Sequence, residues 1–431
     1  MLKTTRLFVV LVLATSGFMA TPASASGDGA TVPRGTGEVS AVLTEMAPLI
    51  SRNRQGPTRT SRLYGIVGYA MLSASSQRPA FLANVIDPVE IPEVPEGLDD
   101  AIAAVAAGTT AVRKLMPTKL DRTTYAELRD KLLAGLVASA PQDIDVRASL
   151  VRGAQAAVAV LARAKKDGLD GALKMTYLAP QSAGGWIPTP PGYQAAIDPG
   201  WGSLRTYLPS TTSCDLPEPP RGDDATNPFG AVAREVADVT AALTDEQKLI
   251  ARFWDDGRGR SSTPSGHWVE IAARAAAAKS RPASDTIAMF GSMTMALSDG
   301  VIANWREKYR WSVERPVSVL ARVDPEWNSY LTTPAFPEYP SGHSTISRVA
   351  AEVLTAAIGE WAFTDPGWGL TDGSRKKFEI TPRSFDSFLD AAAEAGESRV
   401  FGGIHYPFSI DAGADLGVCV VAPFLARSPV N

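Results

Sequence analysis

The chain is dominated by Ala- and Leu-rich stretches in which apolar residues recur at helical spacing, whereas strand-length runs of Val, Ile and Thr are almost absent. This period is typical of helices that bury one face against other helices. Three helices are predicted between Gly97 and Gly171, at 99–116, 123–140 and 146–168. Further helices are predicted at 229–254, 267–279, 284–308, 344–361, 383–395 and 410–426. The pattern predicts an all-α protein made of two packed helix bundles.

Residues 179–228 interrupt the helical pattern with a stretch rich in Pro, Gly and aromatic residues. A loop of this length is normally either functional or disordered. Its large aromatic side chains argue against disorder; they are Trp186, Tyr193, Trp201 and Tyr207. We therefore expect an ordered covering loop at 179–228, between a helical region at 26–178 and a second helical bundle at 229–431.

The first residues have the pattern of a secretory signal peptide at 1–25. Lys3 and Arg6 precede an apolar run, and Ala23, Ser24 and Ala25 match a cleavage site. The apolar run is too short to span a bilayer, and no later segment reaches about 18 uninterrupted apolar residues. We therefore expect a mature protein that starts near residue 26, is secreted or periplasmic, and does not insert into a membrane.

The formal net charge is −4, and signal cleavage would make the chain more acidic. A field that attracts nucleic acid is therefore not expected, and any anion site must be a local cluster of cations. The two cysteines, Cys214 and Cys419, are compatible with a disulfide in an exported protein, but equally with two buried thiols. An acidic helical bundle of this kind could also form a homodimer.

Histidines are few, and two of the three lie in unusual surroundings. His343 ends the sequence Pro-Ser-Gly-His, and His405 follows Ser-Arg after a short spacer. Upstream, the segment KYRWSVERP contains Lys308 and Arg315. Because seven residues make about two helical turns, the two cations are predicted to project from one face of a helix end.

Together these segments supply the groups that bind a highly charged oxyanion. Arg315 and Arg399 offer guanidinium forks that match paired oxygens, and Lys308 adds a compact charge. Ser341 offers a hydroxyl. The N–H of Gly342, beside a predicted helix start, can approach an oxygen closely because no side chain intervenes. One histidine can then bond the central atom while the other transfers protons.

The order and spacing of these residues closely resemble the signature of a known superfamily, which contains the type-2 phosphatidic acid phosphatases and the vanadium-dependent haloperoxidases. Its pattern is K-x6-RP, then PSGH, then SR-x5-H, and it is matched here at 308–316, 340–343 and 398–405. The resemblance extends to the Trp- and Pro-rich loop at 186–207, to FWDDG at 253–257 and to TPAFPEYPSGHST at 333–345. It covers the chain from about residue 179 onward.

The resemblance implies a role for each of these residues. His405 would be the covalent ligand of vanadium, or the nucleophile that accepts a phosphoryl group, and His343 would be the acid–base residue opposite. The equatorial oxygens would be held by Lys308, Arg315, Ser341, Gly342 and Arg399. As in chloroperoxidase-type sites, Trp305 and Phe336 would line the halide side, although both could be ordinary core aromatics. Asp256 would pair with Arg399.

Two chemistries fit such a pocket. The favoured one is a haloperoxidase in which vanadate binds hydrogen peroxide, His343 and Lys308 polarise it, and a halide attacks to give hypohalous acid. An aromatic wall that excludes water favours this reaction. The alternative is an exported acid phosphatase that acts on a phosphate ester through a phosphohistidine at His405, because phosphate and vanadate fit the same site. A binding protein that has lost turnover is least favoured, since both histidines are present.

Two features depart from the family pattern. Many members place Asp four residues after the last histidine, but here that position is Ser409, a neutral partner that would raise imidazole basicity less than a carboxylate does. His267 ends a second Pro-Ser-Gly-His that lacks the other two motif parts. It is expected to cap or pack a helix, and its replacement is expected to leave activity nearly intact.

Overall fold

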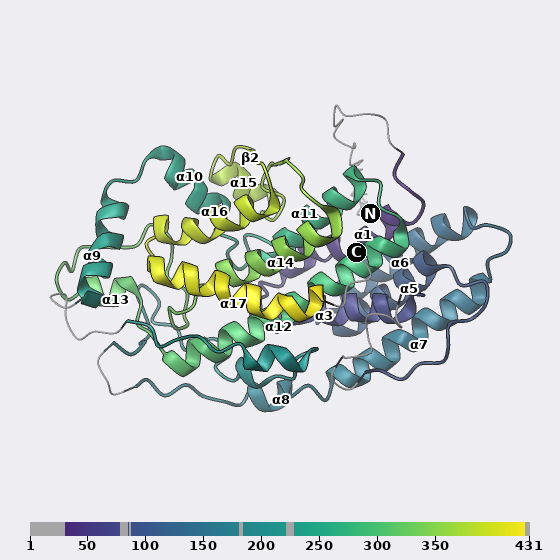
Figure 1. Ribbon diagram of the computed structural model, residues 1–431, viewed down its shortest axis with the longest axis horizontal. Helices are drawn as coiled ribbons and strands as arrows, with labels where there is room; N and C mark the ends of the chain where they lie inside the picture. The colour runs from purple at the N-terminus through teal and green to yellow at the C-terminus, as the bar shows by residue number, and fades with distance from the viewer. Residues whose placement is uncertain (1–30, 78–84, 86–87, 181–183, 221–227, 427–431) are drawn as a thin grey trace, which may run out of the picture. The chain divides into compact units, whose positions relative to one another are not determined.

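A computed structural model describes residues 31–77, 85, 88–180, 184–220 and 228–426. The predicted signal peptide and its cleavage site lie outside the described residues. The described residues from Val32 onward form one compact unit. Within the described residues this unit consists of helices, irregular segments and one small two-stranded sheet, so the predicted all-α class is confirmed (Figure 1).

The elements follow in two runs separated by the Pro-rich segment. The first run comprises α1 (Thr36–Thr44), α2 (Ala47–Arg52), α3 (Pro57–Ala74), α5 (Asp100–Leu115), α6 (Lys119–Ala138), α7 (Val146–Ala164) and α8 (Leu169–Ala172). Two short 3-10 helices, η1 (Trp201–Ser203) and η2 (Pro209–Ser213), lie between the runs. The second run comprises α9 (Pro228–Ala241), α10 (Asp245–Phe253), α11 (Thr263–Ala278), α12 (Ala283–Trp311), α13 (Pro316–Leu320), α14 (Gly342–Ile358), β1 (Phe363–Asp365), α15 (Asp372–Lys377), β2 (Arg383–Phe385), α16 (Phe388–Phe401) and α17 (Pro407–Leu425).

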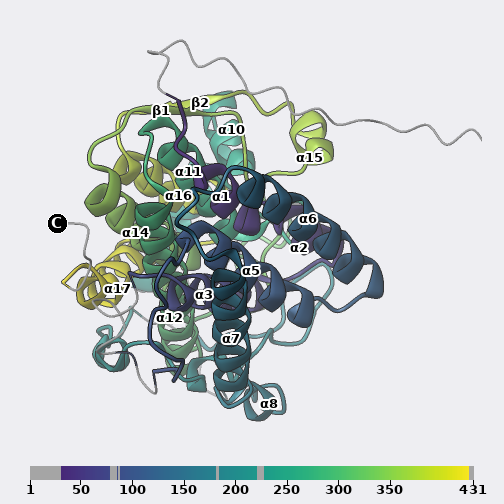
Figure 2. The same cartoon turned by 90° about the vertical axis from the view of Figure 1, so that its right-hand side faces the viewer.

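Helix α12 is shared by two groups of helices. On one side it packs against α3, which contacts α5 and α7; on the other it packs against α14 and α17 (Figures 1 and 2). Residues 286–305 of α12 are all buried and mostly apolar or small, which is typical of a helix stretch without a solvent face. A Cβ at Gly68 of α3 would lie 1.9 Å from the Thr294 hydroxyl oxygen, so the two backbones approach closely. The two predicted bundles therefore pack around one common helix.

Two predicted helices differ from the structure by more than four residues at an end or by a break, whereas the others differ by four residues or fewer at each end. The helix predicted at 229–254 is divided into α9 and α10, because Thr244 starts a new helix. Its hydroxyl accepts a hydrogen bond from the Gln247 N–H at 3.2 Å, and the Gln247 side chain accepts one from the Thr244 N–H at 3.0 Å, which is a capping box. The helix predicted at 383–395 starts only at Phe388. The residues before it, Arg383–Phe385, pair antiparallel with Phe363–Asp365 instead.

The described part of the covering segment, residues 179–228, lies along α12. Trp186, Trp201 and Tyr207 are buried, whereas Tyr193 is 65% exposed. The carboxylate of Asp299, on α12, accepts a hydrogen bond from the backbone N–H of Tyr207 at 2.8 Å. Most of the aromatic side chains that predicted an ordered segment are therefore anchored in the core.

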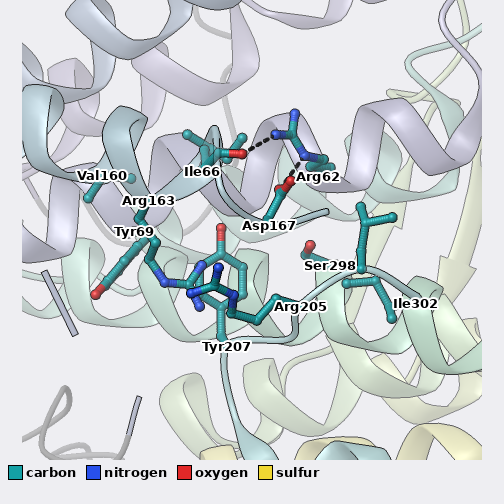
Figure 3. Close-up of a pocket in the computed structure, with 12 residues that line it drawn as sticks. Arg62, Ile66, Tyr69, Val160, Arg163, Asp167, Arg205, Tyr207, Ser298 and Ile302 are labelled. Carbon is teal, nitrogen blue, oxygen red and sulfur yellow. Dashed lines mark hydrogen bonds and ion pairs between the residues drawn. The ribbon is translucent and has the colours of Figure 1, made fainter. Parts of the chain in front are cut away.

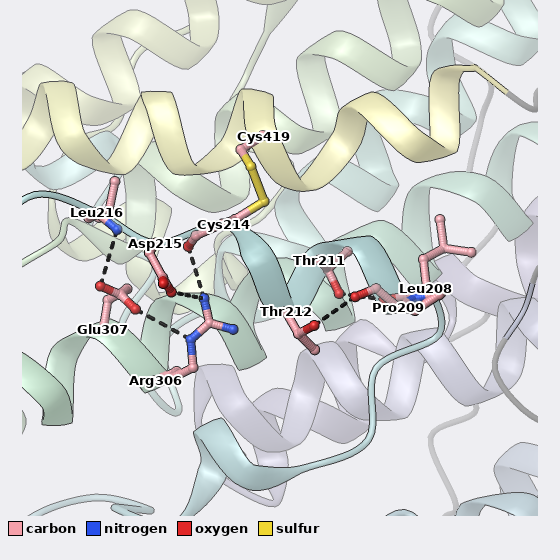
Figure 4. Close-up of a disulfide and its surroundings, with 10 residues drawn as sticks. All are labelled: Leu208, Pro209, Thr211, Thr212, Cys214, Asp215, Leu216, Arg306, Glu307 and Cys419. Atoms are coloured by element: carbon pink, nitrogen blue, oxygen red, sulfur yellow. Dashed lines mark hydrogen bonds and ion pairs between the residues drawn. A yellow bond between two sulfur atoms is a disulfide. The ribbon is translucent and has the colours of Figure 1, made fainter.

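A disulfide joins the covering segment to α17. Cys214 and Cys419 are bonded, with their Cα atoms 5.8 Å apart (Figure 4), so the sequence alternative of two free thiols does not hold. Arg306 of α12 donates to the Cys214 carbonyl at 2.9 Å, and the Leu216 N–H donates to Glu307 at 3.3 Å. The segment is thus fixed to both α12 and α17.

A small cavity beside the covering segment lies between α3 and α7 (Figure 3). Its volume of about 10 Å³ is roughly what one water molecule needs. The guanidinium of Arg163 lies 4.7 Å from the ring centroid of Tyr207, and Arg62 forms an ion pair with Asp167 at 2.7 Å. These contacts hold the segment in place, and the cavity is too small for a substrate.

Two described helices, α12 and α17, are long and apolar enough to cross a membrane by length and composition. The most apolar 18-residue stretch of α12 is completely buried, as expected for the core helix of a folded protein. In α17, 44% of the corresponding stretch is buried. The absence of membrane insertion and the borders of the regions remain predictions.

Candidate functional site

The three motif segments converge where α12 ends, where α14 begins and where α16 passes into α17. Lys308 lies in the last turn of α12, which ends at Trp311 because Ser312 adopts a left-handed conformation with φ of 51°. Arg315 is the residue before α13. The prediction that Lys308 and Arg315 project from one helix face is therefore wrong. They reach the site from two elements on either side of a chain reversal.

The ring of Phe336 brings these two cations together. The Lys308 ammonium lies 5.1 Å from the ring centroid, and the Arg315 guanidinium carbon lies 5.0 Å from it. Lys308 donates to the carbonyls of Pro337, Glu338 and Pro340 at 3.0, 2.9 and 2.6 Å. The segment 336–340 therefore folds around the lysine. Phe336 also contacts Trp305, with ring centroids 5.0 Å apart, so the two predicted halide-side aromatics form one wall.

Arg315 links this wall to His405. Its Nε donates to the Phe336 carbonyl at 3.0 Å, and its Nη1 donates to the Ile404 carbonyl at 2.7 Å and lies 3.2 Å from His405 Nε2. Its remaining nitrogen, Nη2, is buried without a hydrogen-bond partner among the described residues. Because buried polar atoms are normally satisfied, this unpaired donor indicates the position of an external acceptor.

The N-terminus of α14 forms another side of the site. Ser341 caps the helix, and its hydroxyl accepts from the Ser344 N–H at 3.3 Å. Gly342 and His343 occupy the first turn, where backbone N–H groups have no partner within the helix and attract anions. A Cβ at Gly342 would meet the Asn304 side-chain oxygen at 3.7 Å, which is an ordinary van der Waals contact, so Asn304 packs against this turn.

Arg399 approaches His343 from α16. Its Nη1 lies 3.3 Å from His343 Nε2, and its Nη2 donates to the Ala251 carbonyl at 3.3 Å. Burial, Arg399 and neighbouring cations hold the pKa of His343 well below its usual value, against a backbone hydrogen bond to Trp254 that raises it. Burial and the charges of Arg315 and Lys308 likewise lower the pKa of His405. Both imidazoles are therefore neutral.

The tautomer of each ring follows from its arginine neighbour. A guanidinium can only donate hydrogen bonds, so the Nε2 atoms of His343 and His405 must carry lone pairs. Their Nδ1 atoms carry the hydrogens. The charge that His343 would carry if protonated also lowers the pKa of His405, after burial and the charges of Arg315, Lys308 and Arg399. The structure therefore brings both histidines, with unprotonated Nε2 atoms, to one site.

The charge balance of the site requires an anion. Lys308, Arg315 and Arg399 are at most 2% exposed, yet none forms an ion pair with a carboxylate among the described residues. Burial lowers the pKa of Lys308 well below its usual value and that of Arg315 and of Arg399 to about 10. Glu338 offsets part of the charge of Lys308 and Arg315, and Asp255 and Asp256 offset part of that of Arg399, without forming ion pairs with them. A negative ligand in contact with the three cations would offset the remaining cost of burying them. The residues present therefore fit a small, multiply charged oxyanion.

Glu338 is a site residue that sequence reasoning missed. Its Oε1 lies 2.6 Å from His405 Nδ1 and accepts from the Tyr406 N–H at 3.0 Å. Ser409, the expected partner of the ring, is more distant at 3.5 Å. Burial raises the pKa of Glu338 to about 7, although Arg315 and Lys308 oppose this. The one available signal was an acidic residue in the FPEYPSGH segment, five positions before His343.

Asp256 does not make the predicted pair with Arg399. Its Oδ2 accepts a hydrogen bond from His267 Nδ1 at 3.1 Å, and no Asp256–Arg399 ion pair occurs in the described part of the chain. Its negative charge still raises the pKa of Arg399. The acidic residue therefore lies near the arginine but is held by the third histidine.

A larger hollow of about 410 Å³ lies outside this cluster, between residues 175–180 and the end of α12. Tyr177, Tyr309 and Trp311 line it, but none of the predicted site residues does. Tyr309 donates to the Ile197 carbonyl at 2.6 Å, and Trp305 donates to the same carbonyl at 3.3 Å. The covering segment thus separates the hollow from the aromatic wall.

Comparisons with known proteins find likenesses to vanadium haloperoxidases. Residues 287–426 match the second helical-bundle domain of vanadium chloroperoxidase. A vanadium chloroperoxidase from Curvularia inaequalis is 24% identical over 178 residues, which span 31% of this chain and 29% of that protein. The chain thus matches less than a third of the length of this curated relative.

Solved structures extend the likeness to most of the chain. The crystal structure described as the first bacterial vanadium-dependent iodoperoxidase superposes with a TM-score of 0.79 at 28% identity, covering 91% of this chain and 96% of that one. A holo-type bacterial vanadium-dependent chloroperoxidase superposes with a TM-score of 0.64 at 18% identity, covering 86% and 93%. The second of these shows a shared fold alone.

Proposed function

We propose that this chain, which belongs to the superfamily of vanadium haloperoxidases and type-2 phosphatidic acid phosphatases, is a vanadate-dependent haloperoxidase. The reaction consumes a halide ion, hydrogen peroxide and a proton, and yields hypohalous acid and water. The observation that carries the proposal is the group of three buried cations around two neutral imidazoles, since none of the three forms an ion pair with a carboxylate of the described residues.

The groups that would hold vanadate are hydrogen-bond donors without a partner and positively charged side chains. Arg315 Nη2 has no hydrogen-bond partner among the described residues, and the first turn of α14 presents backbone N–H groups. Arg399 adds charge, and so does Lys308, whose ammonium also donates to three carbonyls. His405 Nε2, which faces Arg315, would be the covalent ligand because its lone pair is available once Nδ1 donates to Glu338. Bound vanadate supplies a Lewis-acidic centre that activates hydrogen peroxide for attack by a halide.

His343 is placed to move the proton that the reaction needs. Its Nε2 carries a lone pair, and its low pKa leaves the ring neutral and ready to accept a proton near the oxyanion. Trp305 and Phe336 cover the side of the site formed by Lys308 and Arg315. An apolar wall there excludes water and strengthens the electrostatic interactions with a halide.

Metal analysis combined with a halogenation assay tests this proposal. Apo-protein titrated with vanadate should bind one equivalent and then halogenate a phenol in the presence of hydrogen peroxide, with iodide the first halide to try because it is the most easily oxidised. Arg315→Ala should lose both properties. The matched control Arg322→Ala, which removes an arginine paired with Glu314 at 2.8 Å, should retain them.

The outcome that would reverse the proposal is equally specific. If vanadate-loaded protein did not halogenate but the apo-protein hydrolysed phosphate esters steadily, with vanadate as an inhibitor, the chain would be a phosphatase acting through His405.

We also propose that the protein is exported. The disulfide between Cys214 and Cys419 supports an oxidising compartment. Sequencing the N-terminus of protein recovered outside the cytoplasm should give a start near residue 26, and an intact residue 1 on that protein would refute cleavage.

A further inference from the structure

His267 is held between two carboxylates in the interior. Its Nδ1 lies 3.1 Å from Asp256 Oδ2, and its Nε2 lies 2.7 Å from Asp365 Oδ2. All three side chains are fully buried. Because ionised carboxylates can only accept hydrogen bonds, both ring nitrogens must donate, and the ring is an imidazolium. The two carboxylates raise the pKa of His267 to about 10 despite its burial.

Neighbouring groups leave the ring no freedom to move. The indole of Trp254 stacks on it, with centroids 4.7 Å apart. On another side, a Cβ at Gly369 would lie 2.3 Å from His267 Cγ, so the backbone there is in direct contact with the ring. Asp365 is itself fixed, because its Oδ1 accepts from the N–H groups of Gly367 and Trp368 at 2.7 and 2.8 Å. The imidazolium therefore joins α11, β1 and the segment after α10.

The end of α10 and the segment after it also touch the candidate site. The Ala251 carbonyl accepts from Arg399 Nη2 at 3.3 Å, and the Trp254 backbone forms a hydrogen bond with the His343 ring. Asp256 also belongs to this segment, and its negative charge raises the pKa of Arg399. Residues 251–256 thus link His267 to the candidate site. Trp254 and Asp256 contact His267. Ala251 contacts Arg399, and the Trp254 backbone contacts His343.

We propose that His267 is a positioning residue of the oxyanion site, which acts through residues 251–256 to fix the His343 ring and the charge around Arg399. Its role differs from that of a packing residue because an uncharged replacement leaves Asp256 and Asp365 as two buried carboxylates without their shared cation. Asp256 would then turn towards another donor, and Arg399 is a buried cation on which its charge already acts. This reverses the expectation that replacing His267 leaves the site nearly unchanged.

The proposal concerns anion binding and ring geometry, so its test does not require catalysis; only the activity readout rests on the proposed function. His267→Gln keeps a polar side chain of similar length but removes the cation. The matched control is Tyr125→Phe, which removes a buried hydrogen bond to the Val42 carbonyl in the first helix group. Both variants should lower the unfolding temperature, but only the first should affect the site.

Two measurements on apo-protein carry the test. The dissociation constant of inorganic phosphate, from calorimetry, should rise about tenfold in His267→Gln and stay within twofold in Tyr125→Phe, as for loss of an indirect support. The ring ¹⁵N shifts of His343 should change only in His267→Gln. They can be assigned because the chain has three histidines. In vanadate-loaded protein, kcat for halogenation should fall while KM for halide stays within twofold.

A folded His267→Gln variant with unchanged His343 shifts and unchanged phosphate affinity would overturn the proposal. If that variant does not fold, Asp365→Asn keeps the His267–Asp256 contact and removes only one carboxylate. Its phosphate affinity should then change in the same direction by a smaller factor, and an unchanged affinity would equally overturn the proposal. If halogenation is absent in every form but the binding and ring shifts change as expected, the positioning role stands and the proposed function fails.

Discussion

The Nδ1 atom of His405 lies 2.6 Å from Oε1 of Glu338, a residue 67 positions earlier in the chain. This carboxylate occupies the place that an Asp four residues after the histidine would fill in many family members, where this chain has Ser409. Glu338 fixes the ring orientation and leaves Nε2 unprotonated. The support for the proposed vanadium ligand therefore comes from the segment before α14 instead of from α17.

Glu338→Gln should weaken vanadate binding by about 10- to 100-fold, the range typical for loss of a group that orients a metal ligand. The amide can still accept a hydrogen bond from Nδ1, but it carries no charge. Vanadate affinity from equilibrium dialysis measures the effect. Adding Ser409→Asp to the variant should restore much of the affinity, because a carboxylate would again be within reach of Nδ1. No recovery in a folded double variant would show that Glu338 has another role.

His405→Ala should abolish halogenation and should discriminate between two anions. Vanadate affinity should fall by more than phosphate affinity, because phosphate relies on the cations alone whereas vanadate would also lose a bond to Nε2. Parallel titrations of the two anions into apo-protein give the comparison. Equal losses for both would contradict a covalent role for His405.

Breaking the disulfide should destabilise the protein. Cys214 and Cys419 are 205 residues apart in sequence, so the crosslink removes much freedom from the unfolded chain, and its loss should cost about 2–5 kcal/mol. Unfolding of the Cys214→Ser, Cys419→Ser double variant in denaturant measures the difference. Reduced wild-type protein should behave like the variant, and a wild-type protein unaffected by reductant would argue against the bond.

The stability of the protein should depend on pH through His267. Its pKa is raised to about 10 in the folded protein, against about 6.5 for an unperturbed histidine. The stabilisation is therefore complete below about pH 6.5 and is lost as the pH rises towards 10. Other groups titrate in this window, so the measurable quantity is the difference in unfolding free energy between wild-type protein and His267→Gln. That difference should shrink between pH 6.5 and 10, and a constant difference would mean that the ring is neutral.

The helical class and the cluster of motif residues were accessible from the sequence, because helical periodicity is local and the motif residues occur in fixed short patterns. The turn after α12 was not, since nothing in the local pattern indicates that Ser312 adopts a left-handed conformation and ends the helix before Arg315. The break at Thr244 had a local signal, because Thr followed three residues later by Gln is the pattern of a capping box. The helical periodicity on both sides of it nevertheless predicted one continuous helix.

Partners that depend on tertiary packing could not be derived in this way. Glu338 and His405, or Asp256 and His267, meet only because separate helices bring them together. Resemblance to a family directed attention to the position of Ser409 and to Arg399, and the partners found in the structure are different ones. A carboxylate near a buried imidazole can come from any segment that the fold places beside it.

The close contact of Gly68 with Thr294 bears on whether residues 229–431 can fold without the N-terminal helices. Lys308 lies on α12, and α3 covers one side of that helix. A fragment beginning at residue 229 would lack α3, so this apolar side of α12 would be exposed to water. Such a fragment should aggregate or remain unfolded, even though it contains every motif residue. The candidate site residues all lie after residue 229, yet their half of the chain is expected to need the N-terminal helices in order to fold.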